Sequence, residues 1–225
     1  MIKNYWLKLS ISSALSGIVM ALAGYELVCM DSKNLFILGG FVQGFGTLII
    51  LFFNLYFFNC HLCDAFVKES RTKLIISILF GLIINSAFVV ATSYLLRLTS
   101  TDAIINSAIK FTNYRTISVG SITGKEWYKA LLTGLFCGVL VYAGVYIYKR
   151  VNNAFIKVLT ICLAVGIFVV CGFENYATNL SYISVANMWN LGTFLDVIIV
   201  LIGNIFGAYL TYFAISFATK KNNNN

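Results

Sequence analysis

Residues 171–179 have the sequence CGFENYATN, and they decide the fold because they interrupt an apolar run that extends over residues 155–186. A second interruption, NLYFFNCHLCD at residues 54–64, lies within the apolar run 35–67. Both runs are longer than the about 20 apolar residues that cross a bilayer as one straight helix. The sequence contains no proline, so a break in either run must come from glycine or from polar residues. We therefore expect both runs to be discontinuous helices.

The composition of the whole chain indicates an integral membrane protein. Of the 225 residues, 60% are hydrophobic and 11% are charged, and the mean hydropathy is +0.86. An ordinary soluble domain has about 25% charged residues, and a soluble fold of this size could not bury so much apolar surface. These values exclude a soluble enzyme, a nucleic-acid-binding domain and a disordered chain. The net charge of +8 does not indicate nucleic-acid binding, because the basic residues lie in short gaps between apolar runs.

Charged gaps divide the chain into six apolar spans, at residues 9–30, 35–67, 74–96, 130–148, 155–186 and 191–218. We therefore expect an all-α integral membrane protein with six transmembrane helices in a single domain over residues 1–218, followed by a disordered polar tail at residues 219–225. Ten Lys and Arg residues flank the spans on the side of the termini and six on the other side, which favours cytoplasmic termini in a plasma or inner membrane. The ionisable residues within the spans, Glu26, Glu174 and Asp196, lie on separate segments with no visible nucleophile–base pair, so we do not expect an enzyme.

The two halves of the chain resemble each other. Three markers recur in the same order and at nearly the same spacing: Leu15-Ser16-Gly17 with Leu132-Thr133-Gly134, Phe57-Phe58-Asn59 with Phe173-Glu174-Asn175, and Asn85 with Asn204. The repeats extend over about residues 9–96 and 130–218. Because each contains three spans, an odd number, the second copy enters the membrane from the opposite side. This 3+3 inverted repeat places both helix breaks near the midplane, and paired breaks at corresponding positions are the best sequence indicator of a membrane transport site.

With these markers the chain resembles the formate–nitrite transporter family. GFENYATN, residues 172–179, resembles the GFEH-x-x-AN signature of the family's fifth helix, and GNIFG, residues 203–207, resembles the GN-x-x-G of its sixth. The stretch over residues 46–59 resembles the loop within the second helix, and Gly134 with the apolar run after it resembles the fourth helix. The resemblance implies an aquaporin-like protomer with helices two and five interrupted by midplane loops, assembled as a homopentamer with one pore in each protomer. It implies passage of small monovalent anions or their conjugate acids, of the formate, nitrite, lactate and hydrosulfide class.

The resemblance also implies which residues lie at the centre of the pore. Asn175 takes the position of the family's central histidine, and Asn59 takes that of the threonine that faces it. Asparagine has hydrogen-bond donors and acceptors but no titratable proton. Proton transfer to a passing anion therefore cannot proceed here as it would through a histidine. Asn175 can donate an amide N–H to an anion, or it can favour a neutral, protonated acid.

Further pore residues follow from the same resemblance. Phe57, Phe58 and Phe168 are the candidates for the apolar constrictions, which resist ions by dewetting. Lys125 is the candidate for a lysine in the outer vestibule, where it would raise the local concentration of anions.

Three polar residues are candidates for holding the interrupted backbone rather than the permeant. Glu174 lies at membrane depth, where a charge is costly, but a carboxylate can accept hydrogen bonds from the free N–H groups of its loop. Asn85 and Asn204 occupy matching places in the third and sixth spans. We expect all three to act as loop scaffold.

The segment Cys60-His61-Leu62-Cys63-Asp64 holds the only histidine of the chain together with two thiols and a carboxylate. Such groups can bind zinc, but no second Cys/His pair occurs, and small apolar cysteines are common in membrane helices. We expect no metal site and no cofactor, while the sequence leaves open whether His61 replaces the missing pore histidine. Two other functions also stay open: a pore for small neutral solutes, and a membrane assembly protein that does not transport.

Overall fold

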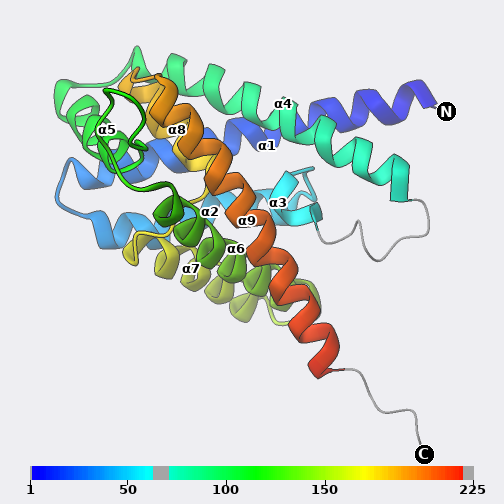
Figure 1. The fold of residues 1–225 in the computed structure, drawn as a ribbon. Coiled ribbons are helices and arrows are strands. Elements are labelled where there is room, and N and C mark those ends of the chain that lie inside the picture. Colours follow the sequence, from blue (N-terminus) through cyan, green and yellow to red (C-terminus); the bar gives the residue numbers. More distant parts are fainter. Residues whose placement is uncertain (1, 63–70, 220–225) are drawn as a thin grey trace, which may run out of the picture.

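The computed structural model describes residues 2–62 and 71–219, and these are almost entirely helical (Figure 1). The helices of the described residues are α1 (Ile2–Asp31), α2 (Phe36–Phe52), α3 (Phe58–His61), α4 (Arg71–Arg97), α5 (Asp102–Tyr114), α6 (Trp127–Arg150), α7 (Ala154–Val170), α8 (Tyr176–Ala186) and α9 (Leu191–Ala218). Two isolated β-bridges, Ile117 with Lys125 and Val119 with Ile122, fold the connection between α5 and α6. The expected all-α class is confirmed. Of the expected polar tail at residues 219–225, all but Thr219 lies outside the described residues.

The apolar helices fall into two classes of length. Among the described residues, four helices are by length and composition able to cross a membrane, namely α1, α4, α6 and α9, and two shorter apolar helices are α2 and α7. Each of the two longest apolar runs of the sequence is divided between two helices, α2 with α3 and α7 with α8. The breaks between them are residues 53–57 and 171–175.

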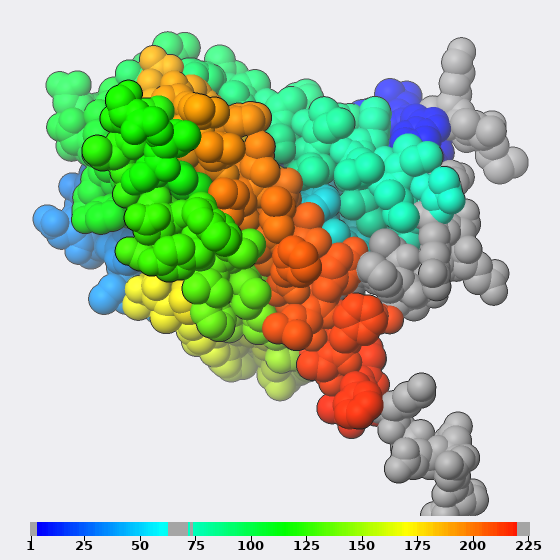
Figure 2. All heavy atoms as spheres, viewed as in Figure 1, coloured from blue at the N-terminus to red at the C-terminus, as the bar shows by residue number. Residues whose placement is uncertain are grey.

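Corresponding helices of the two halves make corresponding contacts. α1 packs on α4 as α6 packs on α9, α1 packs on α2 as α6 packs on α7, and α3 packs on α4 as α8 packs on α9. α2 and α7 pack against each other between the two halves. Figure 2 shows α9 crossing the visible face between α6 and α4, and Figure 1 places the two ends of the described chain at the same end of the bundle.

Two glycines let the long helices approach closely. A Cβ at Gly17 of α1 would lie 2.6 Å from the carbonyl oxygen of Asn85 in α4, and a Cβ at Gly138 of α6 would collide with the carbonyl oxygen of Asn204 in α9. Small residues at such contacts bring membrane helices together. The structural partner of Gly17 is therefore Gly138, one helical turn after the Gly134 that the sequence comparison paired with it.

A glycine seam, formed by Gly40 and Gly44, joins α2 to α7. A Cβ at Gly44 would lie 2.9 Å from the Cα of Cys162, and one at Gly40 would lie 3.0 Å from a methyl carbon of Val169. The seam brings the backbones of the two broken helices together, so the loops at their ends lie on either side of one tight contact.

The helix α5 is a feature that the span pattern did not predict, because it lies in the long hydrophilic connection at residues 97–129. It buries one stripe of side chains, Ser107, Ala108, Phe111 and Thr112, at helical spacing. This stripe packs on α8 and α1. The spacing was visible in the sequence, but the segment is too short and too polar to count as a membrane span.

Candidate functional site

The two shorter apolar helices, α2 and α7, end in the same way. The N–H of Phe173 donates to the carbonyl oxygen of Phe168 over 2.8 Å, and Leu55 makes the equivalent bond at the end of α2, also over 2.8 Å. The residue that turns the chain has a left-handed backbone, Asn54 with φ 51° and Gly172 with φ 71°. This is the Schellman motif, which satisfies the last carbonyl groups of a helix. Backbone and turn residues therefore end both helices without proline.

One asparagine holds the beginning of each helix that follows a break. The N–H of Phe58 donates to Asn85 Oδ1 over 3.1 Å, and the N–H of Tyr176 donates to Asn204 Oδ1 over 3.1 Å. Each asparagine also donates from Nδ2 to the carbonyl oxygen two residues before that helix start, over 3.2 Å for Asn85 and 2.8 Å for Asn204. The two asparagines thus make matching bonds from α4 and α9, and we call each arrangement an asparagine clamp.

The clamps fix which residues of the two halves correspond. Phe57 precedes α3, as Asn175 precedes α8. The structural partner of Asn175 is therefore Phe57, two residues before the Asn59 that the sequence comparison paired with it. One half of the molecule places an apolar ring at this position and the other half places an amide.

Asn175 is buried at the start of α8, with 4% of its surface exposed. Its Oδ1 accepts the N–H of Ala177 over 3.0 Å, which makes it the N-cap of the helix. The amide therefore stabilises the helix start, and the amide nitrogen is the donor that it can offer to a passing molecule.

Aromatic rings fill the space beside Asn175. Phe57 and Phe58 are both 2% exposed and Tyr176 is 1% exposed. The Tyr176 ring stacks on Phe57 with 6.5 Å between centroids and meets Phe58 edge-on at 5.8 Å. Phe168, 4% exposed, lies near the end of α7. We call Phe57, Phe58 and Tyr176 the aromatic plug, in which Tyr176 is a residue that the sequence analysis missed although it directly follows Asn175.

Asn59 directly follows Phe58 of the aromatic plug, in α3. It is 8% exposed, and its Oδ1 has no hydrogen-bond partner among the described residues. It faces a cavity of about 10 Å³, which is close to the space that one water molecule needs. The other residues that line this cavity come from α6 and α9: Cys137, Gly138, Val141, Tyr142, Asn204 and Ala208.

A much larger cavity of about 590 Å³, which we call the vestibule, opens at the opposite end of the bundle from the chain ends. Its charged lining residues are Lys110, Arg115, Lys125 and Lys129, which are basic, and Asp31 and Glu174, which are acidic. The vestibule therefore has an excess of positive charge, which attracts anions to its mouth.

Lys125 lies at the floor of the vestibule and is held by two carboxylates. Its Nζ is paired with Glu174 Oε1 and lies 2.7 Å from Asp196 Oδ1. The Nδ2 of Asn179 bridges the same carboxylates, at 2.8 Å from Glu174 and 2.9 Å from Asp196. The Nε of Arg115 in turn donates to Asn179 Oδ1 over 2.8 Å. We call these five residues the charge cluster.

The charge cluster contains groups that the sequence analysis did not connect. Asp196 was recognised only as an isolated ionisable residue, and Asn179 only as part of a signature. Glu174 accepts its bonds from side chains, Lys125, Asn179 and Thr133, rather than from the N–H groups of its own loop as the sequence suggested. Its carboxylate therefore connects the loop to the connection before α6.

His61 and Asn59 lie on different sides of α3. Its ring stacks on Tyr56, with 4.3 Å between centroids, and its Nδ1 lies 3.1 Å from the carbonyl oxygen of Phe57. Tyr56 packs against Gly81 of α4, whereas Asn59 faces α6 and α9. His61 does not line the small cavity. Cys63 and Asp64, the remaining members of the candidate metal-binding segment, lie outside the described residues.

Comparisons with known proteins agree with this architecture. The family model described as "Formate/nitrite transporter" matches residues 1–218. A solved structure titled "FNT family ion channel" matches with a TM-score of 0.79 and 16% identity, covering 96% of this chain and 92% of its own. Another, titled "Pentameric formate channel with formate bound", matches with a TM-score of 0.76 and 18% identity, covering 97% and 98%. No curated protein matches the chain. The two structures share the fold of this chain.

Proposed function

The chain belongs to the formate/nitrite transporter family, and we propose that it conducts small monovalent anions or their conjugate acids, of the formate, nitrite, lactate and hydrosulfide class, through a pore in each protomer. The observation that carries the proposal is the pair of asparagine clamps. They hold two helix starts inside an apolar bundle, and the N-terminus of a helix carries partial positive charge. Irregular backbone at membrane depth is tolerated only if it is buried in protein or lines a cavity.

The proposed topology has six membrane spans in a 3+3 inverted repeat. In it, α2 with α3 forms the second span and α7 with α8 forms the fifth, interrupted near the midplane. The mirrored packing of the helices supports this arrangement. Both termini lie in the cytoplasm in this proposal, because the basic residues Lys8, Lys149 and Arg150 gather at the end of the bundle where the chain starts and ends. The vestibule then opens to the outside.

The proposed path runs from the vestibule past Phe168 to Asn175, and from there past the aromatic plug to Asn59. Phe168 forms the outer constriction, while Phe57 and Phe58 form the inner one, as their burial and aromatic contacts support. Apolar rings force a permeant to lose part of its hydration, so it must be small and carry no more than one charge.

Asn175 sets the chemistry of the proposed pore. Its Oδ1 is used by the helix start, so the group it offers to the permeant is an N–H donor. A donor of this kind stabilises an anion but cannot give it a proton. Asn59 offers the opposite chemistry on the inner side, an acceptor without a partner among the described residues. This acceptor favours the second candidate function, the passage of an undissociated acid or another small neutral solute that can donate a hydrogen bond.

We further propose that the protein assembles as a homopentamer in the lipid bilayer. The shared fold with a channel titled as pentameric supports this arrangement. Exposed apolar side chains on the outer helix faces, such as Phe206 and Phe213 of α9, provide surface for contact with lipid or with neighbouring copies.

The proposal is tested by uptake of labelled formate into proteoliposomes that contain the purified protein, at about pH 5 and pH 7, with the Asn175→His variant measured in parallel. We expect the native protein to conduct formate. The ratio of the uptake rates at the two pH values distinguishes passage of the formate anion from passage of undissociated formic acid. Uptake by the variant alone would mean an intact fold with a different permeant. No uptake by either form, in a folded oligomer, would contradict formate passage and favour a protein that does not transport.

A further inference from the structure

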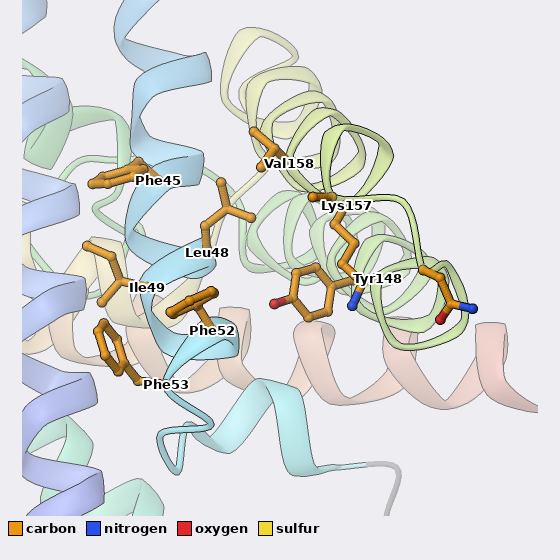
Figure 3. A pocket seen from close by; sticks show the side chains of 10 residues that line it. Phe45, Leu48, Ile49, Phe52, Phe53, Tyr148, Lys157 and Val158 are labelled. Atoms are coloured by element: carbon orange, nitrogen blue, oxygen red, sulfur yellow. The ribbon is translucent and has the colours of Figure 1, made fainter.

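Two cavities of the described residues differ in the charge of their walls. Phe45, Leu48 and Phe52 of α2 line an apolar groove of about 440 Å³, and among the described residues of its lining only Lys157 is charged (Figure 3). The vestibule, in contrast, has four basic and two acidic residues in its lining. The vestibule is therefore the cavity suited to recognising an anion, and its cations differ in how far they are already neutralised.

Two lysines of the vestibule have carboxylate partners of their own. The Nζ of Lys125 is paired with Glu174 and lies 2.7 Å from Asp196 Oδ1. The Nζ of Lys110 lies 3.3 Å from Asp31 Oδ1. An anion that enters the vestibule must compete with these carboxylates for either lysine, so both are weak binding groups for it.

Arg115 and Lys129 are the other two cations of the vestibule. Over residues 2–62 and 71–219, neither of them is in a salt bridge with a carboxylate. Lys129 is exposed in the first turn of α6, and a lysine is a point charge on a flexible stem. Arg115 directly follows α5 as its C-cap residue and is half-buried. The two cations therefore differ in how firmly they are held.

The guanidinium group of Arg115 is fixed by four contacts. Its Nε donates to Asn179 Oδ1 over 2.8 Å, and its Nη1 donates to the carbonyl oxygen of Phe111 over 3.0 Å. The guanidinium carbon lies 4.8 Å from the ring centroid of Tyr182 and 5.3 Å from that of Phe111, at distances where aromatic rings attract a cation.

These contacts leave one edge of the Arg115 guanidinium for a ligand. An arginine side chain has five N–H donors, one on Nε and two on each terminal nitrogen. The bonds to Asn179 and Phe111 use one donor of Nε and one of Nη1. One donor on Nη1 and both on Nη2 remain without a partner among the described residues. Donors on two adjacent nitrogens form the fork that binds two oxygen atoms at once.

We propose that Arg115 is the anion-binding residue of the vestibule, and that it selects anions with two oxygen atoms on one planar centre, such as formate and nitrite. The proposal rests on the function proposed above and narrows the class of anion within it. A carboxylate accepts two parallel N–H···O bonds from the fork, whereas a single-atom anion such as chloride offers one acceptor to the same edge. The buried stripe of α5, which packs on α8, then serves to place Arg115.

A role in charge balance is the alternative for Arg115. The charge cluster holds two cations and two carboxylates, so its formal charge is zero, and Arg115 contacts the carboxylates through Asn179. Lysine in place of arginine keeps this balance of charge but has no planar fork. The Arg115→Lys variant therefore separates recognition of a planar anion from charge balance.

The test is binding of formate to the purified full-length oligomer in detergent, measured by saturation-transfer NMR on the formate proton. Nitrite and chloride are the competitors at constant ionic strength, and the concentration of each that displaces half of the formate gives the preference. The variant is Arg115→Lys. Lys129→Ala is the matched control, because it removes a cation of the same vestibule that has no fork. Thermal unfolding of each variant verifies its fold.

We expect nitrite to displace formate from the native protein at a concentration about fivefold lower than chloride requires. Arg115→Lys should weaken formate binding by about tenfold, the equivalent of one hydrogen bond to a charged group, and should remove the preference for nitrite over chloride. Lys129→Ala should weaken the binding of all three anions alike and keep the preference.

Equal displacement by nitrite and chloride in the native protein would overturn the proposal, and this comparison does not require that any variant folds. A folded Arg115→Lys variant with the native preference would overturn it as well, and would favour charge balance. The readouts do not depend on transport. Formate that binds as expected but does not enter proteoliposomes would contradict the proposed function and leave this inference intact, while formate uptake with no preference at Arg115 would do the reverse.

Discussion

The carboxylate of Asp196 lies 2.7 Å from the Nζ of Lys125, so α9 holds the same lysine that Glu174 holds from the break before α8. The side chain of Lys125 is 14% exposed and that of Asp196 is fully buried. A pair of carboxylates on one lysine leaves the floor of the vestibule with less positive charge than the lysine alone would give it. This arrangement determines how the vestibule should respond to substitution.

The Asp196→Asn variant should bind anions more strongly in the vestibule. Lys125 keeps Glu174 as its partner, and the amide of the new residue can still bond to Asn179, so the fold is retained. The local charge becomes more positive by one, which should lower the KM for formate by a few-fold at low salt and less at high salt, since salt screens charges. Uptake measured against formate concentration at two ionic strengths checks this. A KM that does not depend on the substitution at either ionic strength would contradict the prediction.

The Lys125→Ala variant should be strongly destabilised. It leaves the carboxylates of Glu174 and Asp196 buried without their lysine, and removing one partner of a buried ion pair costs about 3–5 kcal/mol. Adding Asp196→Asn to the variant removes one of the unpaired charges and should restore part of this loss. Thermal unfolding in detergent, followed by tryptophan fluorescence, measures the three forms. If the double variant is no more stable than Lys125→Ala, the unpaired carboxylate of Asp196 does not contribute to the destabilisation.

The asparagine clamp on α8 should matter more to stability than an ordinary helix cap. Asn204→Ala removes the partner of the Tyr176 N–H and of two backbone carbonyls, and each buried group left unsatisfied costs about 1–3 kcal/mol. The matched control is Asn153→Ala, which removes a partly solvated cap at the start of α7 and should cost about 1 kcal/mol. Unfolding midpoints of both variants are compared with the native value. Equal shifts would argue against the clamp.

Opening the aromatic plug should change the selectivity between lactate and formate more than it changes the rate of formate uptake. Tyr176→Ser removes the ring that stacks on Phe57 and meets Phe58 and keeps a hydroxyl at the helix start. We expect lactate uptake to rise relative to formate uptake, because the space left by the ring admits a larger permeant. Phe206→Ser, on an exposed face of α9, is the control and should leave the ratio unchanged. A lactate-to-formate ratio equal to that of the native protein would show that the plug does not line the path.

The fold followed from the sequence because apolar length and charged gaps fix where membrane helices begin and end. The predicted spans 74–96 and 191–218 agree closely with α4 and α9. Each of the two longest runs contains two helices of the described residues, α2 and α3 in the first and α7 and α8 in the second. α5 was missed because a short amphipathic helix in a polar connection carries no membrane signal.

The alignment of the two halves was less successful, for physical reasons. Small residues recur on one helix face every turn, so pairing Gly17 with Gly134 rather than with Gly138 preserved the face and hid an error of one turn. At the breaks, matching Asn59 to Asn175 by residue type gave the wrong partner. The residues that turn the chain, Asn54 and Gly172, differ in type but share a left-handed backbone.

The members of the charge cluster could not be connected from the sequence. Arg115, Asn179 and Asp196 come from three separate segments, and only the tertiary structure brings them together around Glu174. The signal that was present was a charge at membrane depth, which predicts a partner without naming it.

The glycine seam between α2 and α7 has a consequence for the speed of passage. Proteins that alternate access rock one repeat against the other, on a timescale of about microseconds to milliseconds. Gly44 lies so close to the backbone of Cys162 that such rocking would break the contact between the halves. Rotation of the buried rings at Phe57 and Tyr176 leaves the seam intact. A pathway that opens by the motion of single rings is not limited to one molecule per rocking cycle, so its flux should rise with the gradient as in a continuous conduit.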